Sequence, residues 1–359
     1  MGVRASADPS ISAQRLAAGS TAPRVPEQGL VTLLEEEIRR LPVLTGEAPG
    51  IADAAGHALR PGGKLLRPLL LVHSAGAGGG DPARVLPAAA GLECAHVGSL
   101  VHDDLIDHDD VRRGRAATHH RFGSATAIVT GNALFFTWFE ALATCADRGI
   151  SSRRLTWAMR IQAETGRQIC EGAAREIAMA GRVDTPIAEY LEMTRLKTAV
   201  LTAAACRIGA VLAGATPART TALGSFGEAL GAAFQIRDDL LPHVGDPAAT
   251  GKPNDSDLRN QRPTLPVLLA RDHATASQAA ALRDAFASLP RDTACARIRQ
   301  LVQETGALAH ASRLAHDKTT EALAHLHRLP VSPYRHRLED LAHDALTDRE
   351  HGLVTNRDA

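Results

Sequence analysis

Apolar residues recur every three or four positions along most of this chain, which is the spacing of one face of an α-helix. The pattern begins near Leu30 and runs to about Glu350, and no alternating strand pattern or repeat of fixed period interrupts it. We therefore expect one all-α domain, a bundle of roughly ten or more helices. The predicted helices cover 30–41, 51–60, 84–108, 125–148, 151–180, 185–213 and 219–241, followed by about three or four more.

The two ends of the chain lack this periodicity. Residues 1–28 are rich in Ala, Ser, Pro and Gly, which predicts a disordered N-terminal tail. The helical domain should span 29–352, and 353–359 should form a C-terminal tail. Within the domain, Pro242 cannot donate a hydrogen bond to the carbonyl of Asp238, so we expect the surrounding helix to end or kink there.

Composition agrees with a helical protein that carries no large charge. Hydrophobic residues make up 45% and aromatic residues 3% of the chain, and Ala and Leu dominate, which favours helix over strand. The net charge is zero, so no overall field attracts nucleic acid and any anion site has to be built locally.

Cysteine spacing and hydropathy bear on the compartment. No run reaches about 18 uncharged apolar residues and the N-terminus lacks a hydrophobic signal core, so we expect a cytoplasmic protein without a transmembrane segment. No CxxC pair occurs, so we interpret the five cysteines as buried, small apolar residues in a reducing cytosol. They are Cys94, Cys145, Cys170, Cys206 and Cys295.

Three aspartates interrupt the apolar helix within Glu93–Arg115. Asp103 and Asp107 lie four residues apart and so stand one above the other, with Asp104 beside them. His96 lies about two turns earlier on the same face. Buried carboxylates are costly unless something positive neutralises them. Mg²⁺ is the first candidate, because it takes oxygen ligands and commonly binds through one or two carboxylates plus substrate phosphates.

A second carboxylate pair, Asp238 and Asp239, lies on another apolar helix much further along the chain. Gln235 shares the face of this pair, because it precedes the two aspartates by three and four residues. Packed face to face, the two acidic helices would line one end of a cavity with alkyl groups below. Such a cavity suits a ligand with a multiply charged head and a hydrocarbon tail, because metal ions bridge carboxylates to diphosphate oxygens.

Basic residues lie close to both acidic stretches. Lys64 and Arg67 follow a glycine pair, where the backbone can approach a phosphate and arginine supplies a fork of donors. Arg112 and Arg113 directly follow the first aspartate cluster, as metal and phosphate recognition would require. Taken alone, Lys64 and Arg67 are more simply explained as solvated surface charges. Arg112 and Arg113 are equally explained by a surface salt-bridge network, and Lys197 alone by a solvated helix lysine.

Several motifs in a fixed order resemble the trans-isoprenyl diphosphate synthases (polyprenyl synthetases), most closely those that make geranylgeranyl and longer products, over roughly 30–350. GGKLLRP at 62–68 is similar to the family's GGKxxRP element, and HDDLID followed by DDVRRG is similar to its first aspartate-rich motif. Lys197 and Thr198 match the family's KT element. The segments FQIRDDLL, GDPAATGKPNDSDLR and PTLP match its second aspartate-rich region.

The resemblance implies the isoprenoid synthase fold around a central deep cavity, a homodimer, and about three Mg²⁺ ions per active site. It implies that metal ions held by Asp103, Asp104 and Asp107 bind the allylic diphosphate. It also implies a further ion on Asp238, with Asp239 in support. The implied diphosphate contacts are Arg112, Lys197 and Lys252 for the allylic substrate, and Lys64, Arg67, His96 and Arg113 for isopentenyl diphosphate.

The activity that the resemblance implies is the Mg²⁺-dependent condensation of isopentenyl diphosphate with an allylic diphosphate to a linear all-trans prenyl diphosphate. The allylic diphosphate ionises, the isopentenyl double bond attacks, and a proton leaves to the departing diphosphate. Apolar walls exclude water, which would quench the cation. Thr198 and Gln235 would stabilise that cation through their oxygens. The catalytic set is Asp103, Asp104, Lys197, Thr198, Gln235 and Asp238.

Two positions depart from the family pattern. Pro242 stands at the fifth position of the second motif, where DDxxD is usual, and Asp246 lies four residues further on as a candidate substitute. Asn132 stands where many members carry Asp. Both departures leave the metal geometry and the level of activity open.

Product length is open to a steric argument. Ser99 and Gly98, the fourth and fifth residues before Asp103, are small and so do not block the path beneath the carboxylates. By family reasoning this favours a product of about twenty carbons or more. The bulky side chains that could still set the floor of the cavity, or simply pack the core, are Phe135, Phe136 and Trp138.

Three alternatives remain. A terpene cyclase on the same fold shares the metal chemistry but needs no isopentenyl site and usually more aromatic lining than this chain offers. A non-catalytic partner subunit of another prenyl synthase would fit the altered second motif. A di-iron carboxylate bundle matches Glu93 and His96, but that architecture needs two Glu-x-x-His motifs, and only this one was found.

Overall fold

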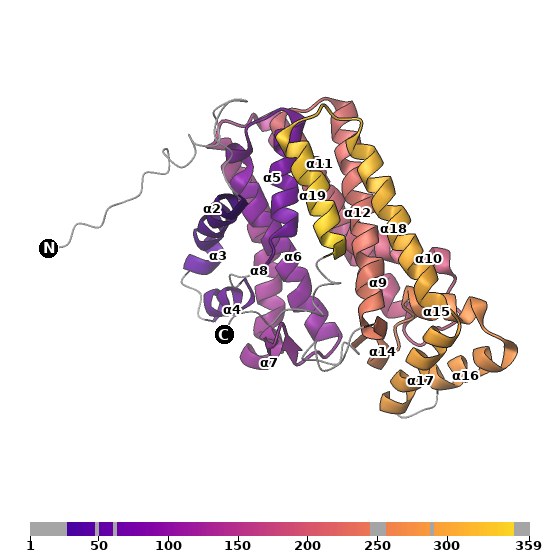
Figure 1. The fold of residues 1–359 in the computed structure, drawn as a ribbon. Helices are drawn as coiled ribbons and strands as arrows, with labels where there is room; N and C mark the ends of the chain where they lie inside the picture. Colours follow the sequence, from indigo (N-terminus) through magenta and orange to yellow (C-terminus); the bar gives the residue numbers. More distant parts are fainter. Residues whose placement is uncertain (1–26, 47–49, 60–62, 245–255, 288–290, 348–359) are drawn as a thin grey trace, which may run out of the picture.

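A computed structural model shows a chain that is almost entirely α-helical (Figure 1), which confirms the predicted fold class. The structure describes residues 27–46, 50–59, 63–244, 256–287 and 291–347. The predicted tails fall almost wholly outside these ranges. Helix α2 already begins at Glu27, so the helical domain starts before the expected residue 29.

The helices follow one another along the chain with short connections. In the first half they are α2 Glu27–Arg39, α3 Pro42–Thr45, α4 Ile51–Ala58, α5 Leu66–Gly78, α6 Leu86–Ile106, α7 Thr118–Phe122, α8 Ser124–Ala143 and α9 Ser152–Met179. In the second half they are α10 Ile187–Thr194, α11 Val200–Ala213, α12 Pro217–Val244, α14 Ser256–Arg259, α15 Leu265–His273, α16 Ala276–Ala287, α17 Arg291–Glu304, α18 Ala307–Leu326 and α19 Pro333–Thr347. Short 3₁₀ turns, η1 Pro82–Val85 and η2 Thr144–Ala146, complete them.

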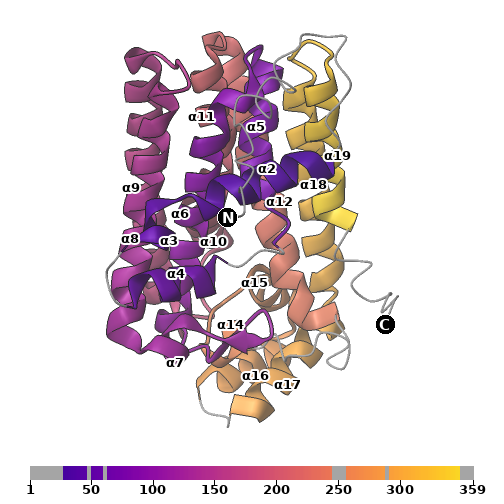
Figure 2. The same cartoon turned by 90° about the vertical axis from the view of Figure 1, so that its left-hand side faces the viewer.

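Long helices stand side by side and form the body of the molecule, and the short helices α14 to α17 lie together at one end (Figures 1 and 2). Helix α11 is the innermost, because it packs against α5, α9 and α12 and is apolar on nearly every side. Two clusters of buried apolar side chains fill the interior, one within the long helices and one beneath α15 to α18. The chemistry-bearing residues lie between these clusters.

The helix that the sequence pattern over 185–213 predicted runs from α10 into α11 without a break. A single π-helical turn, η3 Arg195–Ala199, joins them. Such turns are often found at functional sites. This one carries Lys197 and Thr198.

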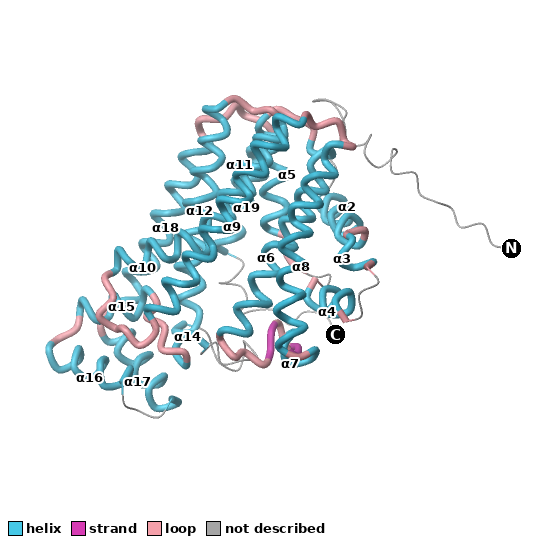
Figure 3. Tube along the Cα trace, turned by 180° about the vertical axis from the view of Figure 1, so that it is seen from behind, coloured by secondary structure: helices cyan, strands magenta, loops and turns pink. Residues whose placement is uncertain are grey.

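Three further sequence expectations need correction. A two-stranded antiparallel hairpin, β1 Val111–Arg112 and β2 Arg115–Ala116, stands where no strand was expected (Figure 3). Helix α12 continues two residues beyond Pro242 to Val244, so the helix does not end at the proline, and a kink there, the other expected outcome, stays a prediction. Cys170 is exposed on α9, whereas the other four cysteines are buried as expected.

Among the residues that the structure describes, two stretches could cross a membrane by length and composition alone, 124–146 and 187–213. Their most apolar windows are 44% and 78% buried inside the protein. Core helices of water-soluble proteins have the same properties, so this is weak support for a membrane span.

Candidate active site

A cavity of about 1100 Å³ opens between the inner helices, and side chains from α5, α6, α9, η3, α12 and the β1–β2 hairpin line it. Every sequence-predicted site residue that the structure describes lies on its wall, and Lys252 falls outside the described residues. The predicted residues brought together here are Lys64, Arg67, His96, Asp103, Asp104, Asp107, Arg112, Arg113, Lys197, Thr198, Gln235, Asp238 and Asp239.

Each aspartate of α6 meets a cation from a different part of the chain. Lys197 Nζ lies 3.4 Å from Asp103 Oδ1. Arg112 Nε donates to Asp104 Oδ1 at 2.6 Å, and Arg262 Nη2 donates to Asp107 Oδ1. The helical spacing that aligned the aspartates therefore directs three cations toward one wall.

These cations do not fully compensate the carboxylates. Burial raises the pKa of Asp104, and the ion pair with Arg112 offsets only part of the effect. Burial likewise raises the pKa of Asp107 to about 7, although Arg262 and Lys197 act in the opposite direction. An aspartate with a raised pKa needs more positive charge to stay ionised, so this wall would gain from a bound cation.

Glu176 on α9 ties two of the cations together, and the sequence did not single it out. Lys197 Nζ donates to Glu176 Oε2 at 2.5 Å, and Arg262 Nη1 lies 3.2 Å from the same oxygen. The sequence motifs do not single out Arg262 either. Burial lowers the pKa of Lys197, but Asp103 and Glu176 raise it by more, so the ammonium stays charged.

A local signal near Glu176 was available in Gly172, a glycine inside a long helix. A Cβ added at Gly172 would lie 2.4 Å from the backbone nitrogen of Lys197, so only glycine lets η3 pack this closely on α9. The close approach places Lys197 within reach of Glu176.

On the opposite wall, Asp239 is only 2% exposed and accepts three hydrogen bonds from the protein. The donors are the Tyr190 hydroxyl, the Leu265 amide at 3.2 Å and Gln235 Nε2 at 3.1 Å. Burial raises the pKa of Asp239 to about 7. These contacts suit a residue that orients Gln235, and the metal role of Asp239 stays a prediction.

Gln235 in turn fixes Thr198. Its Nε2 donates to Asp239, so its Oε1 faces the other way and accepts from the Thr198 hydroxyl at 2.8 Å. The hydroxyl proton of Thr198 is thereby used, and its lone pairs are left for whatever occupies the cavity. Both predicted cation-stabilising residues therefore lie together on this wall.

The oxygen donors of the cavity suit a metal ion only together with a ligand. Within the described part of the chain, no group of three or more His, Cys, Asp and Glu side chains is placed to hold a metal by itself. The cavity does offer carboxylates on two walls, Asp103 on α6 with Asp107 at the C-terminal cap of that helix, and Asp238 on α12. Because Mg²⁺ binds through few carboxylates and completes its shell with phosphate oxygens and water, these residues fit an ion shared with a diphosphate ligand.

A basic region adjoins the acidic walls. Arg67 Nη1 lies 3.2 Å from His96 Nε2. Burial, together with the nearby arginines, lowers the pKa of His96 well below its usual value, so the ring is neutral and its Nε2 accepts from Arg67. Burial also raises the pKa of Glu93, and the nearby Arg67 and Arg113 partly offset this. Four predicted isopentenyl diphosphate contacts therefore share one region, with a buried carboxyl group behind them.

The hairpin explains how Arg112 and Arg113 reach this region. Arg112 pairs with Arg115 in register, and the two residues between them, Arg113 and Gly114, have φ of 49° and 73°. Positive φ at both central residues is the signature of a type I′ turn, the tightest common hairpin connection. The turn places adjacent arginines differently: Arg112 bonds Asp104, and Arg113 faces Gly63 and the Arg67–Glu93 pair.

The sequence predicts that the small residues Ser99 and Gly98 both lie along the path of the hydrocarbon tail, but only Ser99 does. Ser99 lines the cavity, but Gly98 faces α8, where an added Cβ would lie 3.0 Å from the Gly131 carbonyl oxygen. None of the three bulky candidates for the floor lies on the cavity wall. Trp138 is buried in the core, Phe135 contacts His102, and Phe136 is 74% exposed.

Comparison with known proteins identifies the family. A family model described as polyprenyl synthetase matches residues 48–305. The chain belongs to the polyprenyl synthetase family. One relative in this family, the geranylfarnesyl diphosphate synthase of Aeropyrum pernix, is 37% identical over 283 residues, which cover 78% of this chain and 88% of that protein.

Solved structures agree with this assignment. The geranylgeranyl pyrophosphate synthetase of Pyrococcus horikoshii superposes with a TM-score of 0.82 at 31% identity, over 88% of this chain and 95% of that one. The polyprenyl synthase of Caulobacter crescentus, solved with calcium and isoprenyl diphosphate, gives a TM-score of 0.79 at 33% identity, over 89% of this chain and 96% of that one.

Family membership confirms two predictions. The all-α isoprenoid synthase fold is that of the solved polyprenyl synthetases. The protein is a prenyl transferase of isoprenoid biosynthesis, as the motifs indicated. Both findings favour condensation over the cyclase and di-iron alternatives.

Proposed function

We propose that this polyprenyl synthetase condenses isopentenyl diphosphate with an allylic diphosphate, in a Mg²⁺-dependent reaction, to a linear all-trans prenyl diphosphate of about twenty carbons or more. The main support for this function is the set of side chains that line the cavity. A single cavity combines two carboxylate walls, two groups of cations and an apolar interior. A ligand pair with two diphosphates and a hydrocarbon tail uses all of these features.

The allylic diphosphate would lie between α6 and η3. Lys197 and Arg112 already stand beside the aspartates of α6, so their charges would meet the leaving diphosphate without rearrangement. Lys252 would add a third cation. Magnesium, about three ions by family resemblance, would neutralise the leaving diphosphate while Asp103, Asp104, Asp107 and Asp238 hold it.

Ionisation of the allylic group leaves a cation that needs electron-rich neighbours and no water. The Thr198 hydroxyl, oriented by Gln235, would present its lone pairs to that cation. Apolar side chains such as Ile169, Leu201 and Phe234 line the same cavity and would keep water out.

Isopentenyl diphosphate would bind in the basic region formed by Lys64, Arg67, His96 and Arg113. A neutral His96 accepts from Arg67 and so holds the guanidinium without adding charge of its own. The second substrate would then stand beside the first with its double bond toward the allylic carbon. The proton lost after attack would pass to the departing diphosphate.

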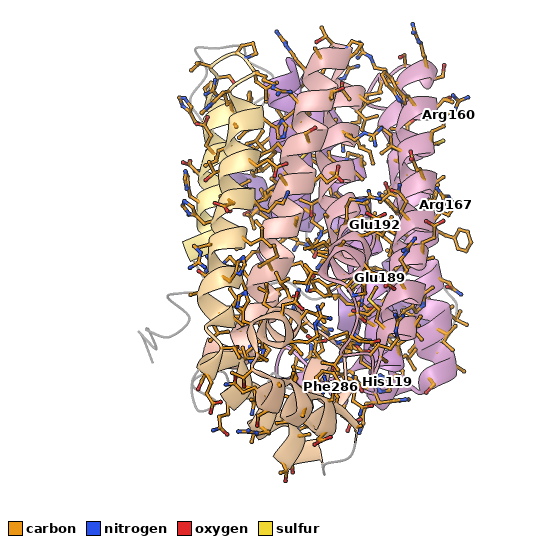
Figure 4. The ribbon with its side chains drawn as sticks, turned by 90° about the vertical axis from the view of Figure 1, so that its right-hand side faces the viewer. His119, Arg160, Arg167, Glu189, Glu192 and Phe286 are labelled. Carbon is orange, nitrogen blue, oxygen red and sulfur yellow. The ribbon has the colours of Figure 1, made fainter. Side chains whose placement is uncertain are left out.

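We further propose a homodimer and retain a cytoplasmic location as a prediction. The outer faces of α8 and α9, adjacent at one edge of Figure 2, carry exposed Ile128, Val129, Phe136, Phe139 and Trp157. Exposed apolar surface of this kind marks protein contacts. Figure 4 shows Arg160 and Arg167 pointing outward from the same side of α9. A second copy of the chain would cover this surface.

The test is turnover of purified protein with Mg²⁺, isopentenyl diphosphate and, in separate reactions, five-, ten- and fifteen-carbon allylic diphosphates. Linear products that require isopentenyl diphosphate support the proposal. A cyclic hydrocarbon made without isopentenyl diphosphate would indicate a cyclase. If the purified protein shows no turnover with any primer and activity appears only when a second prenyl synthase chain is added, the protein would be a non-catalytic partner subunit.

A further inference from the structure

His57 on α4 fastens the second strand of the hairpin to the body of the protein. Its ring Nε2 lies 2.8 Å from the carbonyl oxygen of Ala116. Its other ring nitrogen, Nδ1, is approached by two guanidinium groups, Arg115 Nη2 and Arg121 Nη1, each at 3.2 Å. One side chain thus joins α4, β2 and α7, three elements that are separate in the sequence.

The partners determine the state of the ring. A carbonyl oxygen can only accept and a guanidinium can only donate, so Nε2 carries the hydrogen and Nδ1 offers a lone pair. A single neutral tautomer suits all three contacts, with the two guanidinium groups sharing the one lone pair of Nδ1. A side chain with only donors or only acceptors would make fewer of these three contacts.

Ring packing supports the same geometry. The His57 ring stands edge-on to Phe122 with centroids 5.5 Å apart, and the Arg121 guanidinium lies 5.2 Å from the centre of the Phe122 ring. Arg121 is therefore held from two sides, and so is the imidazole.

Because its two strands are paired, the hairpin links the contacts of His57 with β2 to the arginines that face the cavity. Arg115 and Ala116, the two β2 residues that His57 contacts, are the register partners of Arg112 and Val111. A short turn then carries Arg113 toward Gly63 and Arg67. Fixing β2 consequently restrains the turn that carries Arg113, whereas Arg112 is also held by its own bond to Asp104.

We propose that His57 is a positioning residue of the isopentenyl diphosphate site, which acts by holding the hairpin so that Arg113 faces Gly63 and Arg67. The inference rests on the proposed function for the role of Arg113. It concerns a residue outside every motif that the sequence singled out. His57 does not enter the reaction itself.

Two substitutions separate the contacts. His57→Phe keeps a ring against Phe122 and removes every hydrogen bond. His57→Asn places an amide oxygen near the position of Nδ1 and keeps an acceptor for the two arginines. In His57→Phe we expect KM for isopentenyl diphosphate to rise about tenfold, the weight of one net charge-assisted hydrogen bond, with kcat and the allylic KM changed much less. His57→Asn should recover most of the loss.

Hydrogen exchange gives a readout that does not depend on turnover. The Ala117 amide donates to the Asp110 carbonyl at 2.8 Å and closes the hairpin. Exchange over residues 111–117 should accelerate in His57→Phe while the rest of the fold is unchanged. His310→Phe is the matched control, because His310 also bonds and stacks on a side chain of another helix, His273, but lies away from the cavity.

The outcomes are distinguishable. Unchanged exchange over 111–117 in a folded His57→Phe overturns the proposal. So does an equal rise of both KM values, or a fall in kcat alone. A wild-type protein without condensation activity would contradict the proposed function, while faster hairpin exchange in His57→Phe would still support the restraint by His57.

Discussion

Lys197→Met removes the cation that the acidic wall shares with Glu176. The Lys197 side chain is 16% exposed and lies 2.5 Å from Glu176 and 3.4 Å from Asp103. At an effective dielectric constant of about 20, each of these attractions is worth about 5 to 7 kcal/mol before desolvation of the ammonium is subtracted. Methionine fills similar space but leaves the two carboxylates with less compensation.

The net destabilisation should be about 3 kcal/mol. Breaking a buried ion pair by removing one partner costs about 3–5 kcal/mol, and the lower end applies because Arg262 still neutralises Glu176 at 3.2 Å. Added Mg²⁺ should restore more stability in Lys197→Met than in the wild type, because a bound cation replaces the missing charge. The kcat/KM for condensation should fall by about 10²- to 10³-fold, the usual effect of removing one preorganised donor.

Urea unfolding with and without Mg²⁺, together with steady-state kinetics, measures these effects. Lys318→Met is the matched control, because Lys318 pairs with Glu321 at 2.7 Å on the surface of α18. Its loss should cost about 0–1 kcal/mol and leave turnover unchanged. Equal stability of Lys197→Met and wild type, or equal losses in the two variants, would refute the account of the acidic wall.

Three further predictions concern pH, product length and assembly. The carboxyl groups of Asp107 and Asp239 have pKa values raised from 3.8 to about 7. The stability that they contribute is therefore present below about pH 4 and is lost as the pH rises through 7. In melting experiments on the metal-free protein, the melting temperature of Asp239→Asn should fall less than that of the wild type over this pH range. Ser99→Phe should shorten the product, because the new ring fills the path one turn below Asp103, and unchanged product masses would contradict this. Phe136→Glu should convert a dimer to monomers in light scattering, whereas a dimer that persists would place the interface elsewhere.

Much of the site could be predicted because its motifs are local. Helical periodicity alone aligned Asp103 with Asp107 and placed Gln235 beside the second pair, and the structure brings all three to one cavity. Residues three or four apart on a helix are neighbours whatever the rest of the fold does. The family motifs then supplied the basic residues.

Contacts between distant segments left no such signal. Gly172 marks a close helix contact near Glu176, but it does not say which segments meet there, namely Lys197 from η3 and Arg262 from a later loop. The burial of Asp239 depends on Tyr190, which lies on α10. Both pairings follow from how the helices pack, which periodicity does not specify.

Two differences between the sequence-based expectations and the structure can be explained. Gly98 and Ser99 are adjacent on α6, but Gly98 packs against α8 while Ser99 lines the cavity, and the packing of the helices decides which neighbour covers each residue. The hairpin was overlooked because each strand is only two residues long and shows no alternation. Its turn residues, Arg113 and Gly114, were the available sign.

In this account a single cavity binds both diphosphate substrates and joins the allylic group to isopentenyl diphosphate. Mass spectrometry of the products formed from isopentenyl diphosphate, Mg²⁺ and a fifteen-carbon allylic diphosphate tests it most directly. We predict a linear prenyl diphosphate at least one five-carbon unit longer than the primer, absent when either isopentenyl diphosphate or Mg²⁺ is omitted. Recovery of unextended primer, or a hydrocarbon formed without isopentenyl diphosphate, would contradict the account.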